Sequence, residues 1–378
     1  MELTSIDINK DLLALISQEF SGLYSGELGL SSIEGGQSAA NRALDNLDIT
    51  RYANQRSEVF PIAKRGASVL SPYIRHNILT LDQVYRAVKS APFNDREKFR
   101  DELFWQEYAR HLYARIGVRL FENLRFEADE NNQGDGWLVN QTRMWMASQW
   151  SVRAGKGWLH GQERMYRELI DGSRAANLLG WQWTVGAGTG KPYGFSRWQV
   201  EKRAPGLCMK CPLKKACPIQ EFPEEIAPHQ LEKNPLLDHD LDIESTAGPN
   251  QIVKSGVPKV VLLTIDSMGD GDPALMANPD LPVVFVFNEQ ALSKLQLSSR
   301  RIGFYLQTLR DLSLRKELSV YLGDPYSFAA ENEVAVTYAP VPSFKKFTRL
   351  AEVHPYPWFR APHGGSVRSF SSWRAKIK

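Results

Sequence analysis

Hydrophobic residues recur at helical spacing through residues 1–206, and the strict alternation that marks a strand is rare there. On one stretch of this region, Phe104, Tyr108 and Leu112 follow one another every four residues. Such a stripe is typical of a helix that turns one face toward a core. Residues 1–206 are therefore predicted to form a mainly helical domain.

The pattern changes twice in the second half of the chain. Residues 207–256 hold all three cysteines and several prolines and then become polar and acidic, as in a compact segment followed by a linker. Residues 257–378 start with short apolar runs that alternate with helical stretches and end in a Pro-rich, basic arm from His354 onward. Alternating strands and helices indicate a parallel α/β sheet. Four runs are predicted as its buried strands: Val257–Ile265, Pro282–Asn288, Glu317–Gly323 and Glu333–Ala339.

Composition narrows the function only a little. The chain has 378 residues and a formal net charge of +3, which excludes a strongly basic nucleic-acid binder on total charge but leaves room for a local basic patch. Its ten tryptophans fit either ordinary packing or a planar aromatic cofactor with electron-transfer partners.

The chain carries no predicted export or membrane signal. Its first residues lack a charged segment followed by an apolar one, and its longest apolar runs, Val260–Ile265 and Leu281–Phe287, are too short to span a bilayer. Three cysteines within ten residues do not suggest a disulfide framework. We expect a soluble, cytoplasmic protein without a membrane span.

Four ordered segments carry a specific resemblance. Residues 169–183 contain Ile-Asp-Gly, then Ala-Asn, then Gly-Trp-Gln-Trp; residues 101–112 contain Glu-Leu-Phe-Trp-Gln-Glu; residues 136–144 are Gly-Trp-Leu-Val-Asn-Gln-Thr-Arg-Met; and residues 66–73 are Gly-Ala-Ser-Val-Leu-Ser-Pro-Tyr. Together they resemble the FAD-binding part of the cryptochrome/photolyase family. The resemblance implies an α + α/β protein, with an all-helical photolyase-type FAD-binding domain followed by a small parallel α/β, Rossmann-like domain.

The resemblance also implies roles for individual residues around FAD. Arg143 and Asp171 would form an ion pair beside the flavin, and Asn177 would face the flavin ring. Trp181 and Trp158, together with Asn177, would serve catalysis, the two tryptophans as electron-transfer partners; a third such aromatic residue is not assigned. The full set implied for cofactor binding is Tyr52, Ser68, Leu70, Ser71, Asn140, Arg143, Asp171, Ser173 and Asn177.

On the substrate side, the family positions for a flipped pyrimidine dimer are Glu102, Trp105, Trp137 and Met144. An extruded base needs aromatic walls and a polar anchor, which these residue types supply. The implied activity is light-driven splitting of cyclobutane pyrimidine dimers in damaged DNA by electron transfer.

Several positions depart from the family pattern and keep a second function open. Val69, Gln106 and Gln141 stand where the family has arginine, and Ser173 stands where it has aspartate. Lost arginines weaken phosphate contacts. The alternative is a cryptochrome-like light sensor, or a flavin-containing module that binds a protein partner and does not repair DNA.

The order of the two parts is the reverse of the usual family order. Residues 257–350 resemble a shortened antenna domain, and Gly365–Ala375 resembles the segment that normally leads into the FAD domain. A circular permutation of the family fold would leave this arrangement.

Cys208, Cys211 and Cys217 follow the FAD-like segment directly, at a spacing that suits metal binding. The Ala-Cys-Pro at 216–218 resembles iron–sulfur bacterial photolyases, but no fourth cysteine exists in the chain. Three outcomes therefore stay open: a [4Fe–4S] cluster with a non-cysteine ligand, a zinc site completed by His229, or no metal.

Overall fold

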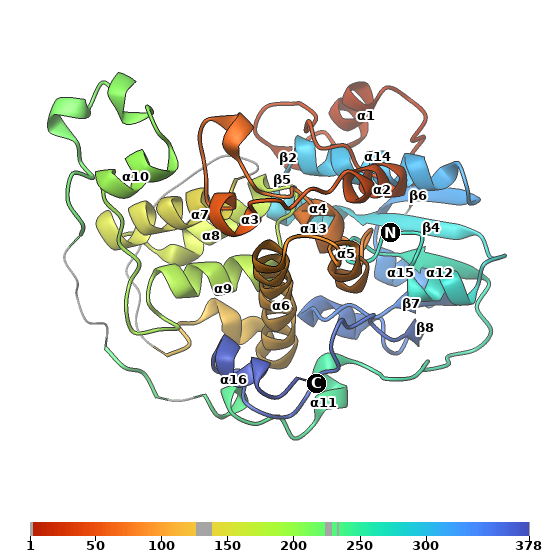
Figure 1. The fold of residues 1–378 in the computed structure, drawn as a ribbon. Coiled ribbons are helices and arrows are strands. Elements are labelled where there is room, and N and C mark those ends of the chain that lie inside the picture. The colour runs from red at the N-terminus through yellow and green to blue at the C-terminus, as the bar shows by residue number, and fades with distance from the viewer. Residues whose placement is uncertain (1–2, 126–137, 224–228, 233, 378) are drawn as a thin grey trace.

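The computed structural model of the protein describes residues 3–125, 138–223, 229–232 and 234–377. Figure 1 shows helices gathered on one side and a sheet on the other, with the long helix α6, Phe93–Ile116, between them. The helices before residue 207 are α1 Leu12–Glu19, α2 Gln37–Asp45, α3 Tyr52–Gln55, α4 Ser71–Arg75, α5 Leu81–Ala87, α6, α7 Asn140–Ala147, α8 Trp158–Glu168, α9 Arg174–Thr184 and α10 Arg197–Arg203.

Helix α6 has the buried face that the sequence predicts. Phe104, Tyr108 and Leu112 are all at most 5% exposed, so the four-residue stripe is confirmed as a core-facing one. Much of the second half of α6 is buried, because other helices, among them α3, α5 and α9, pack against it. Tertiary burial of this kind, more than intrinsic propensity, stabilises a long helix.

The sheet has six strands among the described residues, in the order β1-β6-β4-β3-β7-β8. All neighbours are parallel except β1, which pairs antiparallel with β6 at one edge. The strands are β1 Thr4–Ser5, β3 Val260–Leu263, β4 Val283–Asn288, β6 Leu318–Gly323, β7 Val334–Thr337 and β8 Ala351–His354; a separate small pair joins β2 Tyr24–Ser25 to β5 Leu297–Ser298.

The four predicted strand runs are confirmed as β3, β4, β6 and β7. Both edge strands were missed. Strand β8 contains Glu352 and His354, a polar pair that forms a buried 2.9 Å contact, so its sequence lacks the apolar run of an inner strand. Strand β1 is only two residues long and depends on its partner β6 for its hydrogen bonds.

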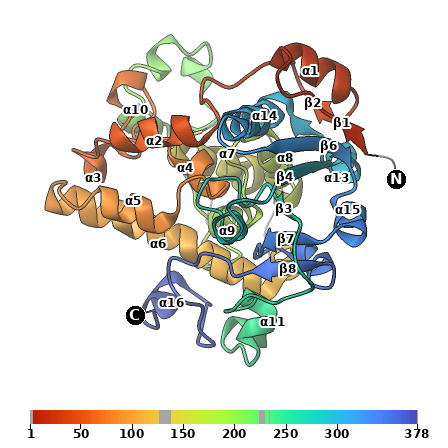
Figure 2. The same ribbon diagram turned by 90° about the vertical axis from the view of Figure 1, so that its right-hand side faces the viewer.

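Helices α12 Pro273–Ala277, α13 Glu289–Leu295, α14 Ser299–Ser313 and α15 Pro325–Glu331 connect the strands. Helix α1 and helix α2, from the start of the chain, lie against α14 (Figures 1 and 2). The first residues thus pack on the α/β part, although the sequence assigns them to the helical domain. The boundaries predicted at residues 206 and 256 stay a prediction.

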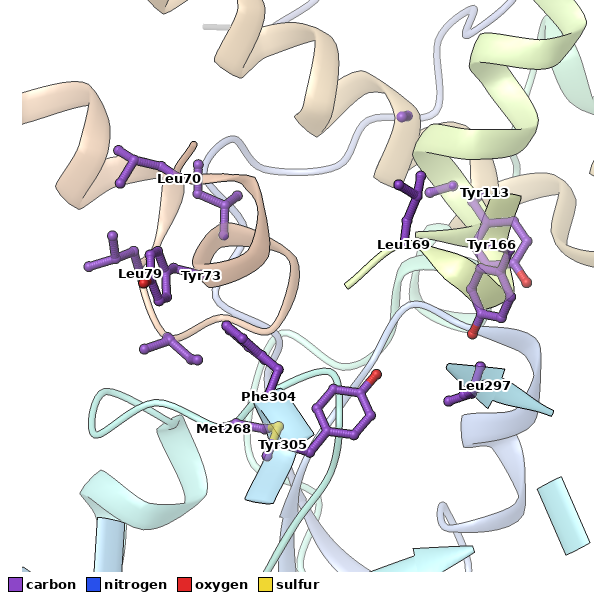
Figure 3. Packing of buried hydrophobic residues seen from close by; sticks show 14 of the residues in the cluster. Leu70, Tyr73, Leu79, Tyr113, Tyr166, Leu169, Met268, Leu297, Phe304 and Tyr305 are labelled. Carbon is purple, nitrogen blue, oxygen red and sulfur yellow. The ribbon is translucent and has the colours of Figure 1, made fainter. Parts of the chain in front are cut away.

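One hydrophobic core runs through both parts. Figure 3 shows residues of the helical part, including Tyr166 and Leu169, facing residues of the α/β part, including Leu297, Phe304 and Tyr305. Tyr305 and Phe304 are 1% exposed or less. The two parts therefore share an interior and are not joined by a linker alone.

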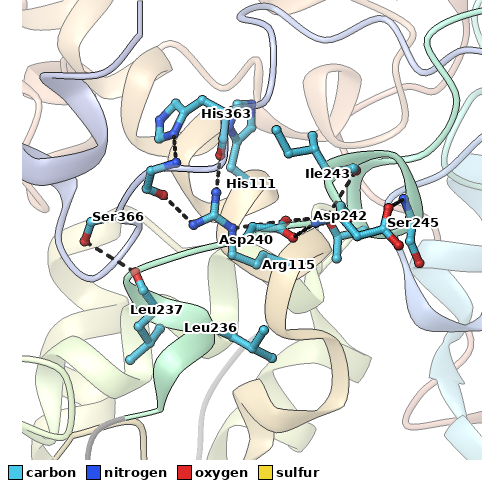
Figure 4. A network of polar contacts seen from close by, with 12 residues as sticks. His111, Arg115, Leu236, Leu237, Asp240, Asp242, Ile243, Ser245, His363 and Ser366 are labelled. Atoms are coloured by element: carbon cyan, nitrogen blue, oxygen red, sulfur yellow. Dashed lines mark hydrogen bonds and ion pairs between the residues drawn. The ribbon is translucent and has the colours of Figure 1, made fainter.

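The linker and the C-terminal arm close over the end of α6. Arg115 of α6 donates to the backbone carbonyl of Gly365 at 2.5 Å and to that of His363, and its Nε lies 3.5 Å from Asp240 (Figure 4). Helix α11, Ile243–Ala247, and helix α16, Phe370–Arg374, flank this network. No helix among the described residues is both long and apolar enough to cross a bilayer.

Candidate functional site

The ion pair expected from the sequence joins α7 to the loop before α9. Arg143 Nη2 donates to Asp171 Oδ2 at 2.8 Å, and Arg143 Nε donates to the carbonyl of Leu138 at 2.9 Å. The Asp171 side chain is 2% exposed and that of Arg143 is 21% exposed. A carboxylate so deeply buried needs a charged partner, so this pair fixes α7 against the loop.

Helix α9 starts directly after that loop. Ser173 is its N-cap, and the Ser173 hydroxyl accepts a hydrogen bond from the backbone N–H of Ala176. Asn177 and Trp181 follow at four-residue spacing on the buried side of α9.

Three polar atoms in the loop before α9 and along α9 have no hydrogen-bond partner in the described part of the protein. They are Asp171 Oδ1, Asn177 Nδ2 and Trp181 Nε1, and all three are buried. Buried polar groups in proteins are almost always paired. An acceptor and two donors left over in residues 171–181 fit a bound polar ligand, and the heteroatom edge of a flavin ring offers both donors and acceptors.

Two arginines that the sequence analysis missed hold the same loop from the other side. Arg75 Nε, at the end of α4, and Arg301 Nη2, on α14, both donate to the carbonyl oxygen of Gly172, at 3.0 and 2.8 Å. Arg301 is fully buried. Nothing local in the sequence marks Arg301, because its role depends on a partner 129 residues away.

The remaining expected cofactor residues lie on α3, α4 and α7. Tyr52 packs edge-on against Phe99 at 4.9 Å, and burial together with the nearby charge of Glu102 raises the pKa of Tyr52 well above its usual value. Leu70 is buried at the start of α4, beside the half-buried Ser68 and Ser71. Asn140 is exposed, and its amide lies 3.5 Å from Met144 Sδ.

The structure therefore joins α4 and α7 to the loop at Asp171 through two direct contacts. Arg75 connects α4 to that loop, and Arg143 connects α7 to it. No contact in the described residues links Tyr52 or Asn140 directly to Asp171.

Both predicted electron-transfer tryptophans are buried. Trp158 Nε1 donates to Asn123 Oδ1 at 2.9 Å. Trp181 packs over Gly161 of α8, where a Cβ atom would lie 2.3 Å from Trp181 Cη2 and 3.0 Å from Trp150 Cε2. Trp150, which the sequence analysis did not assign, is therefore the tryptophan next to Trp181 across this glycine.

The expected substrate residues lie in different surroundings. Glu102 forms ion pairs with Lys98 at 2.9 Å and Arg56 at 3.4 Å. Trp105 stacks on Phe370 of α16, with ring centroids 3.9 Å apart and planes within 10°. One face of Trp105 is therefore already covered by the C-terminal arm. Met144 is half-buried on α7, and Trp137 lies outside the described residues.

The metal site that the spacing of the three cysteines predicts is not confirmed. Among the described residues, no group of three or more His, Cys, Asp or Glu side chains could hold a metal ion. All three thiols are free; Cys208 packs against the apolar cluster around Trp145 and Phe195, and that burial raises the pKa of the Cys208 thiol. His229 is exposed. The [4Fe–4S] cluster, the zinc site and the metal-free alternative therefore all stay predictions.

Comparison with known proteins gives a consistent but partial match. No protein-family model matches the chain. It is 30% identical over 169 residues to the deoxyribodipyrimidine photo-lyase of Vibrio cholerae, covering 35% of this chain and 36% of that protein. It is 27% identical over 192 residues to the photo-lyase of Thermus thermophilus, covering 42% of this chain and 45% of that protein. The chain thus spans less than half the length of these relatives.

Among solved structures, a bacterial class III photolyase from Agrobacterium tumefaciens matches with a TM-score of 0.33 and 21% identity, over 39% of this chain and 37% of that one. A score of this size is too low to support an argument about the fold.

Proposed function

We propose that this chain, a relative of the deoxyribodipyrimidine photo-lyases within the photolyase/cryptochrome family, binds FAD in its helical part and splits cyclobutane pyrimidine dimers in DNA under blue light. The sequence similarity supports the family. The cofactor and the reaction are the parts that we add.

One observation carries the proposal. Asp171 Oδ1 in the loop before α9, and Asn177 Nδ2 and Trp181 Nε1 on α9, are buried without partners in the described residues, and Asp171 belongs to the ion pair with Arg143. Three unpaired polar atoms together would cost several kcal/mol, roughly 1–3 kcal/mol each. A ligand that pairs with these atoms would remove this cost, and this supports a bound polar ring at the site.

In this proposal the protein residues bind and tune the cofactor. Asn177 would donate an amide N–H to the flavin ring. Asp171 would accept a hydrogen bond from the ring through Oδ1, while its Oδ2 holds Arg143 in place. Ser68 and Ser71, at the start of α4, are the residues that would contact the FAD phosphates. The chemistry that bound FAD would supply is transfer of one electron to the dimer under light, with return of that electron after the ring opens.

Trp181, Trp158 and Trp150 are at most 6% exposed, so they would help to exclude water from a bound flavin ring. Trp181 and Trp158 are the proposed electron-transfer partners, and Trp150 is the aromatic side chain packed beside Trp181. On the substrate side, Glu102 and Met144 remain the proposed contacts, together with Trp137. Trp105 offers at most its free face, because Phe370 covers the other.

The stacking of Phe370 on Trp105 favours a second candidate function. If the arm stays in this position, a dimer cannot lie against that face of Trp105, and the protein would act as a flavin-containing light sensor without repair. Illumination of the reduced protein with a dimer-containing oligonucleotide separates the two functions, because only the repair enzyme restores intact pyrimidines.

The cofactor proposal is tested first. The purified chain should be yellow or should take up added FAD with quenching of flavin fluorescence. Asn177→Ala should weaken FAD binding by about tenfold, since it removes one hydrogen bond to the ligand. Asn41→Ala, an exposed residue on α2, is the matched control and should bind FAD like the wild type. A colourless protein that ignores added FAD would refute the proposal.

A further inference from the structure

The segment from α10 to residue 222 forms a lobe at the edge of the molecule. In Figure 1 it is the green loop and helix at the upper left. Its base is fixed to the helical part: Val59 N–H donates to the carbonyl of Arg203 at 2.8 Å, and Arg203 forms an ion pair with Glu58 at 3.0 Å. The lobe surface beyond this anchor takes no part in the candidate flavin site.

Two aromatic rings on the lobe line an open cavity of about 380 Å³ between α10 and residues 220–222. Trp198 is 62% exposed and Phe222 is 55% exposed, although such rings normally bury most of their surface. Leu207, Met209 and Leu213 on the same segment are at least half exposed as well. A group of exposed large apolar side chains marks an interaction site.

The charge of the lobe indicates what would bind. Residues 197–222 contain six basic and two acidic residues, a net charge of +4, whereas the whole chain carries only +3. The basic residues are Arg197, Lys202, Arg203, Lys210, Lys214 and Lys215. The lobe therefore concentrates the positive charge that the overall composition hides, and it should attract a polyanion.

Two acidic residues, Glu201 and Glu221, line the cavity, but the net charge of residues 197–222 stays positive. Glu201 is bound to Arg197 at 2.9 Å, so its charge is neutralised locally. Lys202 Nζ lies 4.9 Å from the centre of the Trp198 ring. A cationic ligand would have to displace Lys202 from the Trp198 ring. A neutral planar ligand needs only a free face of Trp198 on which to stack. Among the described residues that line the cavity, Glu221 is the acid left to repel a phosphate.

We propose that this lobe binds undamaged single-stranded nucleic acid, with an unpaired base in the cavity against Trp198 and Phe222 and the phosphates on the surrounding lysines. Single-strand binding sites combine a basic surface with aromatic side chains on which bases stack, irrespective of sequence. The lobe has both features within 26 residues. An acidic protein segment would use the lysines but would leave the exposed rings unexplained.

The position of the lobe is compatible with a strand that also reaches the helical part. The ring of Trp145, on α7, stacks on Phe195 at the base of the lobe with centroids 5.8 Å apart. Trp145 directly follows Met144, a proposed substrate contact. The inference nevertheless concerns undamaged strands in the dark, so it does not depend on flavin or on repair.

The test is fluorescence anisotropy of a labelled oligothymidylate of about 16 nucleotides, titrated in the dark at low salt with the full chain. Trp198→Ala with Phe222→Ala should weaken binding by about tenfold or more, the effect expected from the loss of base stacking. Lys214→Gln with Lys215→Gln should reduce the slope of log affinity against log salt by about 1.4, or ~0.7 for each lost phosphate contact.

Phe93→Ala is the matched control. Phe93 is an equally exposed ring (67%) with Arg96 over it, but it lies outside the lobe, so its removal should leave the affinity unchanged. Circular dichroism and flavin content should stay at wild-type values in every variant, because the altered residues are at the surface. No binding by the wild type, or equal binding by the lobe and Phe93 variants, would overturn the proposal. Binding of an acidic protein that the lobe variants abolish, without oligonucleotide binding, would also overturn it.

Discussion

The two carboxylate oxygens of Asp171 lie in different surroundings. Oδ2 accepts from Arg143, whereas Oδ1 is buried without a partner in the described residues. The pairing of Arg143 with Asp171 could be predicted from the sequence, because both residues lie in segments that resemble one family. The amide nitrogen of Asn177, six residues after Asp171, is also buried without a partner in the described residues. At the scale of single residues, the protein thus supplies a partner for Asp171 Oδ2 but none, among the described residues, for Asp171 Oδ1 and Asn177 Nδ2.

Asp171→Asn should lower the free energy of unfolding by about 2–3 kcal/mol, because it leaves Arg143 without its counter-charge. The loss stays below the ~3–5 kcal/mol of a fully buried broken pair since Arg143 is 21% exposed. Urea denaturation measures the change. The control is Asp82→Asn, which breaks an exposed Asp82–Arg86 pair of the same 2.8 Å length and should change stability by about 0.5 kcal/mol or less. Equal effects of the two substitutions would contradict the assignment.

At the scale of elements, the loop before α9 is where α4 and α14 meet. Arg75 and Arg301 share one acceptor, the carbonyl of Gly172, and Arg301 also donates to the carbonyl of Tyr166 at 2.6 Å and to the hydroxyl of Tyr305 at 2.6 Å. Two elements far apart in the sequence, α4 and α14, thereby fix the backbone next to Asp171. This is the feature of the site that local sequence patterns could not predict.

Gly172→Ala should destabilise the protein by about 2–4 kcal/mol. Its Cβ atom would lie 2.4 Å from Arg301 Nη1 and 2.4 Å from the carbonyl oxygen of Tyr166, so the loop or Arg301 must move. Gly180→Ala, on α9, is the control: no atom lies within 4 Å of its Cβ position, and helix propensity should raise stability by about 0.5–1 kcal/mol. Denaturant midpoints that shift in the same direction for both variants would refute this account.

At the scale of the whole molecule, the helical and α/β parts are joined by buried polar contacts as well as by the core in Figure 3. His76 lies between the carbonyls of Ile265, after β3, and Ile170, before α9, at 2.6 and 3.2 Å. Arg75 forms an ion pair with Asp266 at 2.6 Å across the same boundary. A substitution in either part should therefore lower the stability of both parts.

Acid should weaken this junction through His76. Burial and the charges of Arg75 and Arg301 hold the pKa of His76 well below its usual value of 6.5, so the ring is neutral in the fold. Below about pH 6.5 the unfolded chain binds a proton that the folded protein does not, and the free energy of unfolding should fall by up to ~1.4 kcal/mol per pH unit. The loss continues until the pKa of the folded state is reached.

Urea denaturation between pH 7 and about pH 5 measures this dependence, and His76→Gln should flatten it. His160→Gln, which removes an exposed histidine from α8, should leave it as in the wild type. Curves for the wild type and His76→Gln that run parallel would show that another group causes the acid sensitivity.

The sequence by itself determined the helical and α/β character, the four inner strands and the core face of α6, because spacing between neighbours decides which side chains can be buried together. It also carries the ordered motifs that resemble the cryptochrome/photolyase family. The circular permutation and the domain boundaries stay predictions. Only the tertiary structure decided that Phe370 covers Trp105, that Arg301 supports Gly172, and that β1 and β8 complete the sheet. Each of these depends on contacts between distant residues, which local spacing does not encode.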